Sequence, residues 1–480
     1  MVITDQFLAS RIFTAQDQQW FAALSGDCNP IHLDTVAARR TLLGVPVVHG
    51  LHNMLWALNT VAAAHPEFPI PKSLRALFNR FVSLGETVTV RLSSVDANQL
   101  RVSVTSNGLS VMTVSIFLST ERLPEPSSDF SANGKTMSVS EPVDLSMNEM
   151  ASLTGTVPYA TDFSIVQSAF REVSRWLSVA RVADLAGCTR IVGMVCPGLH
   201  SIFHGLDIQL TQQRFGRAGV SFRVASTDVR FRRLVLDVAG TGIQGTLTTT
   251  ARQPPVAQPN IKDLAAVVQP SEFANQTAMI VGGSRGLGEL TAKMIAVGGG
   301  RVVITYAQGV ADAKRVVDEI RGARALAEAI PHDVTLPCAN QPIASYAGRI
   351  TNLYYFATPQ IDGKSSDAID LSRLPVFVQF YVNGFYDVSK TLARGKLVAF
   401  YPSSVFVTEC TSKFIAYAMA KAAGELLCAE MTRSWRDVKV LSSRLPRLPT
   451  DQTAGLAATN LDSPVDVVLP LLRSAHALSG

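Results

Sequence analysis

Residues 278–289 read Ala278-Met279-Ile280-Val281-Gly282-Gly283-Ser284-Arg285-Gly286-Leu287-Gly288-Glu289. The four apolar residues predict a buried strand, and the glycines after them permit a tight turn into a helix. Phosphate groups can approach the backbone at such a turn, where the positive end of the helix dipole favours them. A glycine pattern alone is weak evidence, but here a strand precedes it and a helix follows. The stretch therefore predicts a dinucleotide-binding turn in a parallel sheet.

Residues 271–480 continue this pattern on the C-terminal side. Short apolar runs alternate there with helical patterns, at residues 302–306, 353–356, 397–401 and 438–442. Alternation of this kind is typical of β-α-β units. We expect an α/β fold with a Rossmann-type, doubly wound parallel sheet.

Three polar side chains downstream of the turn suggest chemistry. Tyr417 and Lys421 lie on one face of a predicted helix, and Ser404 ends an apolar strand before them. A nearby ammonium favours the phenolate, which acidifies a tyrosine that must protonate a carbonyl, and a serine hydroxyl can hold the same carbonyl. A Tyr-x-x-x-Lys pattern alone usually marks an ordinary amphipathic helix. The three features in this order, after the glycine turn, favour a catalytic site.

Together these motifs resemble the short-chain dehydrogenase/reductase family, over about residues 275–455. The resemblance implies that Tyr417 is the proton donor, that Lys421 lowers its pKa and binds the nicotinamide ribose, and that Ser404 orients the substrate. It matches Asn383 to the family's proton-relay position and Asp333 to the adenine-contacting aspartate. The cofactor-binding residues that it implies are Gly282, Ser284, Arg285, Gly286, Leu287, Gly288, Asp333, Ala357, Tyr417 and Lys421.

The second strand of this segment ends at Tyr306 without an acidic residue for the 2′-hydroxyl of NAD, whereas Arg285 offers a partner for a 2′-phosphate. We therefore expect NADPH. The segment departs from the family in three places. Tyr355-Phe356-Ala357-Thr358 replaces the Asn-Asn-Ala-Gly motif, residues 333–353 are short for a helix and a strand, and no clear seventh strand follows Tyr417.

A second candidate site is the string Ser25-Gly26-Asp27-Cys28-Asn29-Pro30-Ile31-His32. Asp27 and His32 are separated by an Asn-Pro turn, so one cleft can receive both, and such a pair can act as base and acid on adjacent atoms. Gly50 follows soon after in a helix predicted over residues 45–64, where a backbone N–H would face an anionic oxygen. In the plainer alternative, Asp27 caps a helix and His32 packs in a turn.

This string resembles the MaoC-like (R)-specific enoyl-thioester hydratases and dehydratases, over roughly residues 8–120. The resemblance implies a hot-dog fold, in which a curved antiparallel sheet wraps around a long helix. It matches Asp27 and His32 to the catalytic pair and Gly50 to the oxyanion donor. Which of Asp27 and His32 takes which proton stays open.

The middle segment weakly repeats the first, with a helix predicted over residues 165–185 and strands over 220–225 and 246–250. It has no equivalent of the Asp27–His32 string. His200 and His204 could share a helix face at a spacing that can bind zinc, but no third ligand is near, so we expect packing and no metal. We interpret the segment as a silent half of an α+β double hot dog that shapes an acyl tunnel.

Composition limits the remaining possibilities. Polar and proline-rich stretches at about 123–140 and 252–259 divide the 480 residues into predicted domains at 1–125, 140–252 and 271–480. The net charge is +5 without a basic block, which argues against nucleic acid as a partner. The sequence has no apolar run long enough for a membrane span, no signal peptide and no clustered cysteines, so we expect a cytoplasmic protein with reduced thiols.

Both chemistries fit one substrate. We expect a bifunctional enzyme of fatty-acid- or polyketide-like biosynthesis, with 3-oxoacyl-thioester reductase and 3-hydroxyacyl dehydratase (or reverse hydratase) activities on a CoA or acyl-carrier-protein thioester. In one alternative, the reductase acts on a non-thioester ketone beside a separate hydratase. In another, one module is a degenerate acyl-carrier-binding scaffold. Family resemblance alone predicts a homodimer.

Overall fold

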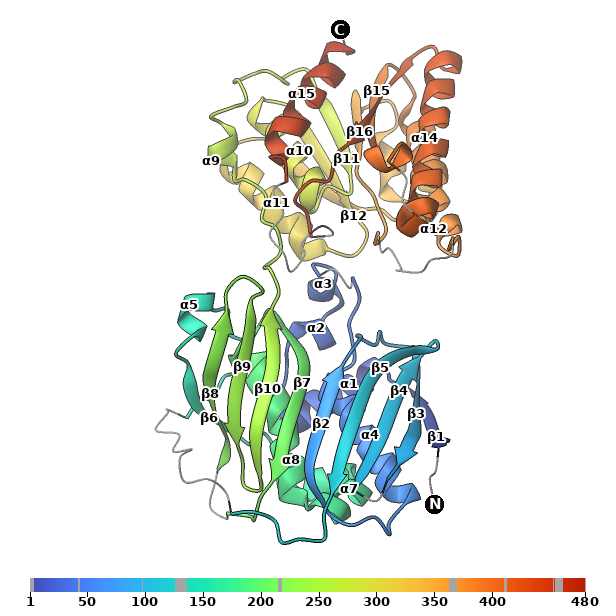
Figure 1. Ribbon diagram of the computed structural model, residues 1–480. Helices are drawn as coiled ribbons and strands as arrows, with labels where there is room; N and C mark the ends of the chain where they lie inside the picture. The colour runs from blue at the N-terminus through green and yellow to red at the C-terminus, as the bar shows by residue number, and fades with distance from the viewer. Residues whose placement is uncertain are drawn as a thin grey trace. The chain divides into compact units, whose positions relative to one another are not determined.

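The computed structural model describes residues 4–41, 44–96, 98–125, 136–214, 218–361, 369–409, 412–451, 453 and 461–479. Its described residues form two units that meet in sequence at Pro254 and Pro255, inside the proline-rich stretch (Figure 1). Residues 126–135 of the other predicted linker lie outside the described residues. The predicted division into three domains stays a prediction.

The N-terminal unit contains one ten-stranded antiparallel sheet made of two five-stranded halves. The strands of the first half are β1 (Thr4–Ile12), β2 (Pro71–Phe78), β3 (Thr87–Val95), β4 (Gln99–Ser106) and β5 (Leu109–Leu118). Those of the second half are β6 (Thr154–Pro158), β7 (Ser201–Leu210), β8 (Gly219–Asp228), β9 (Arg233–Ala239) and β10 (Ile243–Ala251). Alternate residues of β3, Val88, Val90 and Leu92, are buried, as expected for a strand with one face on the core.

The two halves have the same strand order. Read from each outer edge to the centre, the first half runs β1-β3-β4-β5-β2 and the second β6-β8-β9-β10-β7. β2 and β7 pair antiparallel at the centre, with Ser73 opposite Gln209 and Leu77 opposite Gly205. The weak repeat in the sequence therefore corresponds to a repeat of strand order.

The helices of this unit fall into two groups. Those of the first half are α1 (Ala15–Ser25), α2 (Pro30–Leu33), α3 (Thr35–Ala38) and α4 (Gly50–Ala64). Those of the second half are α5 (Met147–Met150), α6 (Phe163–Ala169), α7 (Arg171–Leu177) and α8 (Val179–Arg190), which continues into the π-helical turn η1 (Ile191–Val195). α4 packs against α7 and α8, and side chains from both halves share one core.

Three expectations about these helices need correction. The helix predicted over 45–64 begins only at Gly50, because Val47 and Val48 pair with the segment at Val82 and Ser83 instead. The helix predicted over 165–185 is interrupted at Phe170 and at Ser178, whose φ is +83°. His200 and His204 share no helix face, because His204 lies on β7 and His200 in the turn before it.

The C-terminal unit contains a six-stranded parallel sheet in the order β13-β12-β11-β14-β15-β16. Its strands are β11 (Thr277–Val281), β12 (Arg301–Tyr306), β13 (Ala327–Pro331), β14 (Asn352–Tyr355), β15 (Leu397–Ser404) and β16 (Val438–Leu445). Successive residues of β11 alternate between two cores, since Ala278 and Ile280 face one and Met279 and Val281 the other. The sheet is thus buried on both faces, as the apolar runs predicted.

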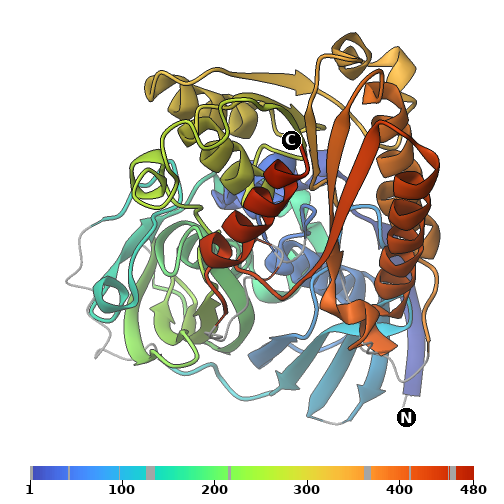
Figure 2. The same ribbon diagram turned by 90° about the horizontal axis from the view of Figure 1, so that it is seen from above.

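Helices cover both faces of this sheet (Figure 2). One face carries α9 (Ile261–Leu264), α10 (Gly286–Val297), α11 (Val310–Gly322) and α15 (Pro464–Ala477). The other carries α12 (Leu374–Val378), the π-helical turn η4 (Gln379–Gly384), α13 (Phe385–Leu392) and α14 (Ile415–Ser434).

Shorter elements complete the C-terminal unit. They are the 3-10 turns η2 (Cys338–Asn340), η3 (Pro342–Tyr346), η5 (Val405–Val407) and η6 (Ser412–Phe414). η2 and η3 occupy the stretch between β13 and β14, which the sequence showed to be short for a full helix. Among the described residues, no helix has the length and hydropathy needed to cross a membrane.

Candidate functional sites

The first candidate site is built on the loop between α1 and α2. Thr14 caps α1 with a capping box, and Gly26 ends the helix with a φ of +76° that favours glycine. Asn29 then caps α2, with Pro30 at its first position. This tight turn places Asp27 and His32 on the same side of the loop, as the string of residues suggested.

Asp27 is almost completely buried, with 1% of its surface exposed. Its Oδ2 accepts a hydrogen bond from the Thr189 hydroxyl at 2.7 Å, and its Oδ1 accepts one from the main-chain N–H of Asn29 at 3.2 Å. Burial raises the pKa of the Asp27 carboxyl, against opposing effects of His32, of these two hydrogen bonds and of Arg190. The raised pKa moves the carboxyl towards the pH range in which it can both take up and release a proton.

His32 lies beside Asp27 with one nitrogen already committed. Its Nδ1 donates to the Val47 carbonyl at 2.8 Å, so the lone pair of the neutral ring is on Nε2. Burial lowers the pKa of His32, although Asp27 and the Val47 carbonyl both oppose this change. His32 is therefore a neutral imidazole near pH 7 whose Nε2 can accept a proton.

His49 stacks on His32, with ring centroids 3.7 Å apart. Its Nδ1 lies 2.8 Å from Gln18 Oε1 and its Nε2 lies 3.0 Å from the Asp27 main-chain oxygen. One nitrogen or oxygen from each of Asp27, His32 and His49 lies within 4.8 Å of the others. Because both nitrogens of His49 and one of His32 face protein acceptors, the cluster suits proton transfer better than the binding of a cation.

Gln18 and His49 were missed by sequence reasoning. Gln18 lies on α1, and its Oε1 also accepts from the His49 amide at 3.0 Å, so it ties α1 to the start of α4. His49 stood next to Gly50 in the sequence and was the available signal. No local pattern marked Gln18, because its partner is 31 residues away.

Gly50 is the first residue of α4. Amides in the first turn of a helix have no acceptor within the helix, and the helix dipole adds positive potential there. The aromatic ring of Phe78 lies directly over Gly50, at 3.3 Å from where a Cβ would be. The Gly50 amide therefore belongs to the first turn of α4, whose amides have no acceptor within the helix.

The histidines of the second half are not part of this cluster. His204 Nε2 lies 2.8 Å from the Thr250 hydroxyl, and His200 pairs with Asp144 at 3.4 Å. Burial lowers the pKa of both. These contacts fit the packing role that the sequence suggested.

The second candidate site begins at the glycine turn between β11 and α10. A Cβ on Gly288 would clash with the Gly282 carbonyl, so the first turn of α10 can pack this closely only with glycine there. Gly286 has a φ of +58°, and its nearest neighbour on the Cβ side is Thr450, at 3.8 Å. The turn therefore leaves space at a helix N-terminus, which fits a dinucleotide phosphate. Ser284 and Leu287 lie in the same turn.

Three groups at the edges of the turn bear on cofactor choice. Arg285 pairs with Asp451 at 3.4 Å, so a 2′-phosphate would compete with that carboxylate. Tyr306 ends β12 without an acidic residue, as expected. Asp333 accepts from the amide and hydroxyl of Thr335, at 2.9 and 2.7 Å, which fixes its carboxylate after β13.

Ser404, Tyr417 and Lys421 lie together at the end of β15 and the start of α14. Tyr417 is 8% exposed and Lys421 is 5% exposed. Burial raises the pKa of Tyr417, and a hydrogen bond with Ser404 opposes that rise. The pKa of Tyr417 is therefore raised and not lowered as expected, and the effect that opposes the rise comes from Ser404 and not from Lys421.

Lys421 is held by carbonyl and aromatic groups. Its Nζ donates to the Pro402 carbonyl at 2.5 Å and lies 3.9 Å from the centroid of the Tyr381 ring. Burial lowers the pKa of Lys421 to about 7. The distance from Lys421 Nζ to the centroid of the Tyr417 ring is longer, at 5.9 Å.

Asn383 lies on the exposed side of η4, where its Nδ2 donates to Gln379 Oε1 at 3.0 Å. No hydrogen bond described in the structure joins it to Tyr417 or Lys421. Tyr381, two residues earlier on the same turn, contacts Lys421 instead, and its hydroxyl bonds to Thr358 at 2.5 Å. Ala357 lies beside Thr358, and its amide packs against Gly282. Sequence reasoning missed Tyr381, since a tyrosine in an apolar helix reads as core.

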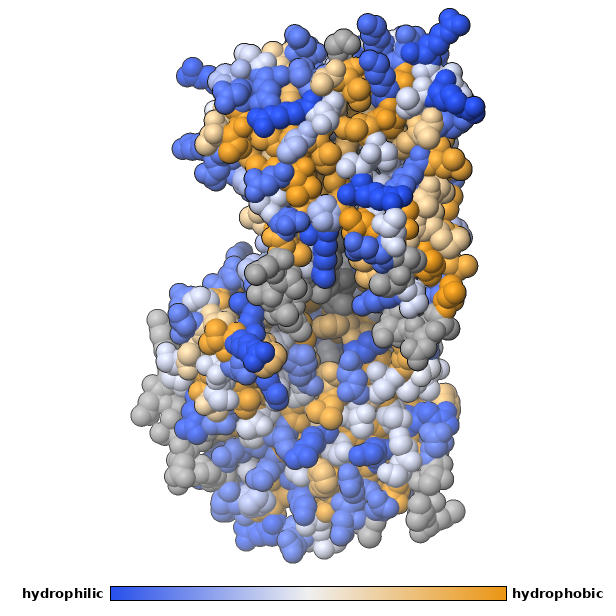
Figure 3. Space-filling model, turned by 45° about the horizontal axis from the view of Figure 1, so that its top comes forward, coloured by the Kyte–Doolittle hydropathy of each residue, from blue (hydrophilic) through white to orange (hydrophobic). Residues whose placement is uncertain are grey.

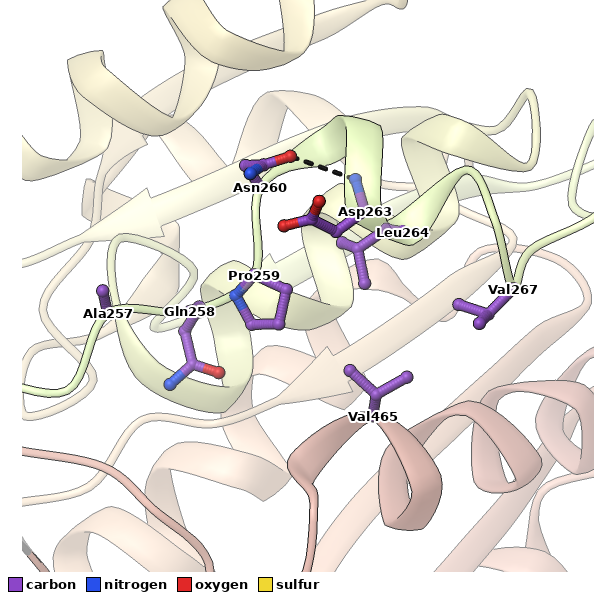
Figure 4. Close-up of a pocket in the computed structure, with 8 residues that line it drawn as sticks. All are labelled: Ala257, Gln258, Pro259, Asn260, Asp263, Leu264, Val267 and Val465. Carbon is purple, nitrogen blue, oxygen red and sulfur yellow. Dashed lines mark hydrogen bonds between the residues drawn. The ribbon is translucent and has the colours of Figure 1, made fainter.

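A separate hollow of about 460 Å³ lies in the C-terminal unit, against α9 and the start of α15 (Figure 4). Its lining residues are Ala257, Gln258, Pro259, Asn260, Asp263, Leu264, Val267 and Val465. None of them is a predicted site residue, and the Asn260 side chain is occupied in capping α9 through the Asp263 amide. We assign no chemistry to this hollow.

Two family models match separate parts of the chain. Residues 5–114 match the MaoC like domain, and residues 276–454 match the short chain dehydrogenase family. The first match contains Asp27, His32 and Gly50, and the second contains the glycine turn with Ser404, Tyr417 and Lys421. No curated protein matches the chain.

Several solved structures are similar to part of the chain. A short chain dehydrogenase from Burkholderia cenocepacia J2315, in complex with NADP, is 22% identical over 42% of this chain and 91% of its own, with a TM-score of 0.39. A short chain dehydrogenase from Salmonella enterica serovar Typhi is 18% identical over 46% and 93%, also with a TM-score of 0.39. An oxidoreductase from Escherichia coli is 16% identical over 44% and 93%, again with a TM-score of 0.39.

Proposed function

We propose that this chain, which contains a MaoC-like dehydratase domain and a short-chain dehydrogenase domain, is a bifunctional enzyme of acyl-thioester metabolism. In this proposal, the C-terminal unit reduces a 3-oxoacyl thioester with NADPH, and the N-terminal unit removes water from the 3-hydroxyacyl product. The reverse direction is (R)-specific hydration of an enoyl thioester. The supporting observation is that one chain carries a buried carboxylate next to a partly buried imidazole in its N-terminal unit, and a glycine turn with a Ser-Tyr-Lys set in its C-terminal unit.

In the N-terminal site, the Gly50 amide would donate to the thioester carbonyl. The charge that builds on that oxygen when the α-proton leaves is then stabilised by the amide and the helix dipole. One member of the Asp27–His32 pair takes the α-proton, and the other gives a proton to the 3-hydroxyl, which leaves as water. The free Nε2 of His32 and the raised pKa of Asp27 support proton exchange near neutral pH.

In the C-terminal site, bound NADPH would supply a hydride to the 3-keto carbon. Ser404 holds the ketone oxygen, and Tyr417 gives that oxygen the proton of its hydroxyl. Lys421 would contact the cofactor ribose and, when protonated, would favour the phenolate that remains on Tyr417. The glycine turn from Gly282 to Gly288 would hold the pyrophosphate.

We infer that the N-terminal unit is a double hot dog. The identical strand order of the two halves and the packing of α4 and α8 in one core support this reading. The second half lacks the Gly-Asp-x-Asn-Pro-x-x-His string and would be silent in proton transfer.

The choice of NADPH over NADH rests on Arg285 in the glycine turn and on the lack of an acidic residue at the end of β12. A 2′-phosphate would displace the Asp451 carboxylate and pair with Arg285 in its place. NADH offers no anion there, so we expect the enzyme to use it less well.

We further expect a homodimer. α12, α13 and α14 carry exposed apolar side chains, namely Val376, Tyr386, Met419 and Leu426, the last with 74% of its surface exposed. Figure 3 shows apolar surface on this side of the C-terminal unit. Burial of such a patch against a second copy would remove it from water.

The test follows both reactions in one cuvette. Purified protein is mixed with NADPH and acetoacetyl-CoA, or with the same acyl group on an acyl carrier protein, while NADPH oxidation and the absorbance of the conjugated enoyl thioester are recorded. We expect oxidation first and enoyl product after it. If NADPH binds but neither thioester is turned over, the C-terminal unit is a scaffold or reduces a different ketone. The replacement of the family's Asn-Asn-Ala-Gly motif by Tyr355–Thr358 would then account for the missing activity.

A further inference from the structure

The loop that carries Asp27 is held by the second half of the N-terminal unit, the half without an acid–base string. Gly26 packs under the Arg190 side chain, which lies 2.7 Å from where a Gly26 Cβ would be. Cys28 donates its amide to the Met194 sulfur at 3.2 Å. Both contacts come from the end of α8 and from η1, more than 160 residues later in the chain.

The π-helical turn η1 and the residues after it leave main-chain carbonyls available to the loop that carries Asp27. Residue 197 is proline and has no N–H, so the Gly193 carbonyl lacks the donor that an α-helix would place four residues later. That carbonyl accepts from Asn29 Nδ2 at 2.8 Å, and the Gly198 carbonyl accepts from the same nitrogen at 3.1 Å. The Asn29 side chain therefore bridges the catalytic loop and the second half.

Thr189 gives the most direct contact. A threonine in a helix commonly turns its hydroxyl back to the carbonyl three or four residues earlier. The buried Thr189 hydroxyl instead donates to Asp27 Oδ2 at 2.7 Å. Gly193 also packs against the Asp27 carboxylate, so closely that a Cβ at this position would overlap it.

We propose that Thr189 is a positioning residue for the Asp27 carboxylate, supplied by the half of the sheet that has no acid–base string of its own. This inference rests on the proposed dehydratase function of Asp27. Thr189 fixes the rotation of the carboxylate, with Oδ2 facing α8 and Oδ1 facing the Asn29 amide. The second half is then part of the active site, although it carries no acid–base string of its own.

The charged and titratable groups around Asp27 define what Thr189 can change. They are His32 on α2, Cys28 in the same loop and Arg190 at the end of α8, while His49 at the start of α4 contacts the Asp27 main chain. A hydroxyl that donates to a carboxylate stabilises its ionised form. Removal of the Thr189 hydroxyl should therefore raise the pKa of Asp27, with the other four groups unchanged.

The test compares full-length Thr189→Val, which keeps the shape and loses the donor, with Thr189→Ser, which keeps the donor. We expect Thr189→Val to lower kcat for enoyl hydration by about 10-fold to 100-fold, the range for one hydrogen bond to a charged group. We also expect the pH-rate limb of Asp27 to move upward by about one unit. Thr189→Ser should restore both. Loss of a merely structural contact would lower activity without moving the limb.

A second measurement does not depend on turnover. The Asp27 carboxyl is titrated directly by NMR in protein with ¹³C-labelled aspartate, with Asp27→Asn used to assign its signal. An upward shift of that titration in Thr189→Val supports the proposal even if the wild-type protein proves inactive on thioesters, which would overturn only the proposed function. An unchanged titration in a folded Thr189→Val protein overturns the positioning role.

Gly193→Ala gives an independent check from the other side of the carboxylate. The added methyl group overlaps Asp27, so we expect a loss of hydration at least as large as that of Thr189→Val. Gly205→Ala on β7, where the atoms nearest to an added Cβ belong to Ala76 and Leu77 and not to Asp27, is the matched control for the strain of an added methyl group. Equal losses in these two variants would contradict the proposal.

Discussion

The two candidate sites hold their buried ionisable groups in different ways. In the N-terminal site, hydrogen bonds from Thr189 and the Asn29 amide oppose the effect of burial on Asp27, and a carbonyl fixes the tautomer of His32. In the C-terminal site, Lys421 has one carbonyl acceptor and lies over the Tyr381 ring. Hydrogen bonds fix the orientation of a side chain and stabilise its charge, whereas an aromatic face stabilises a nearby cation but orients it only weakly.

The difference fits the tasks proposed for the two sites. Elimination needs two proton-transfer groups aimed at neighbouring atoms, so their orientation must be exact to a fraction of an ångström. In the proposed reductase, Lys421 would act mainly as a positive charge near Tyr417 and the cofactor, and that role needs less directional support. In both sites burial favours the neutral form of the side chain: it raises the pKa of Asp27 and Tyr417 and lowers the pKa of His32 and Lys421.

Exchange of one catalytic group in each site should separate the two activities. We expect Asp27→Asn to lower enoyl hydration by about 10²- to 10⁴-fold, because the amide cannot exchange a proton, and to leave NADPH oxidation unchanged. Tyr417→Phe should do the reverse by a similar factor. Steady-state rates of both reactions in both variants check this. If either variant lowers both rates alike, the reactions do not belong to separate sites.

The aromatic support of Lys421 can be removed without changing Lys421. Tyr381→Leu removes the ring, and we expect the pKa of Lys421 to fall below about 7. Since the ammonium form is needed, kcat/KM for reduction should then decline at a lower pH than in the wild-type protein, by about 0.5 to 1 unit. Tyr381→Phe keeps the ring and loses only the bond to Thr358, so its profile should stay near that of wild type.

Asn383→Ala is the matched control on the same turn. If Asn383 relays protons, as its sequence position suggested, this variant loses more activity than Tyr381→Leu. If Tyr381 supports Lys421, the order is reversed. The ranking of the two variants in the NADPH-oxidation assay decides between the positions.

The sequence predicted what lies within a few turns of chain. Asp27 lies just before α2 and His32 on it, and Tyr417 and Lys421 share α14, so their spacing indicated that the members of each pair can lie near each other. Thr189 and Gly193 reach Asp27 from more than 160 residues away, and their residue types carry no signal of that partner. The breaks in the helix predicted over 165–185 were equally hidden, since neither Phe170 nor Ser178 is a usual helix breaker.

The parallel sheet was the easiest element to predict, because strands buried on both faces are continuous apolar runs. The strands that were missed include β1 and β6 at the edges of the N-terminal sheet, its central pair β2 and β7, and β13 at the edge of the parallel sheet. β1 mixes exposed and partly buried side chains, and β6 has only five residues, so neither gives a clear period of two. The strand order of the N-terminal sheet, with its central β2–β7 pair, depends on contacts that no local pattern encodes.

Lys421 should lower the stability of the C-terminal unit near neutral pH. The pKa of Lys421 is about 7 in the folded protein against an ordinary value of 10.5, so the unfolded state binds more protons between these values and stability rises with pH across that window. Lys421→Met removes the buried charge, and we expect about 1–3 kcal/mol of stabilisation at pH 7. Thermal unfolding at pH 7 and pH 10 checks this, and the gain should shrink at the higher pH.

His52 offers the smaller, structural counterpart in the N-terminal unit. It stacks on Phe21 at 4.5 Å, and neither ring nitrogen has a hydrogen-bond partner among the described residues. Burial lowers the pKa of His52 to about 3, so the unfolded state binds more protons between about pH 3 and 6.5, and stability falls as the pH drops through that range.

His52→Phe keeps the stacked ring and removes the titration. Its unfolding free energy should exceed that of wild type by more at pH 4.5 than at pH 8, and enoyl hydration at pH 8 should change less than twofold because His52 contacts neither Asp27 nor His32. A difference that is equal at the two pH values would mean that His52 does not titrate on unfolding. A large loss of enoyl-hydration activity would mean instead that the His52 ring, next to His49, helps to hold Asp27 and His32 in place. The N-terminal site would then depend on aromatic packing as well as on hydrogen bonds.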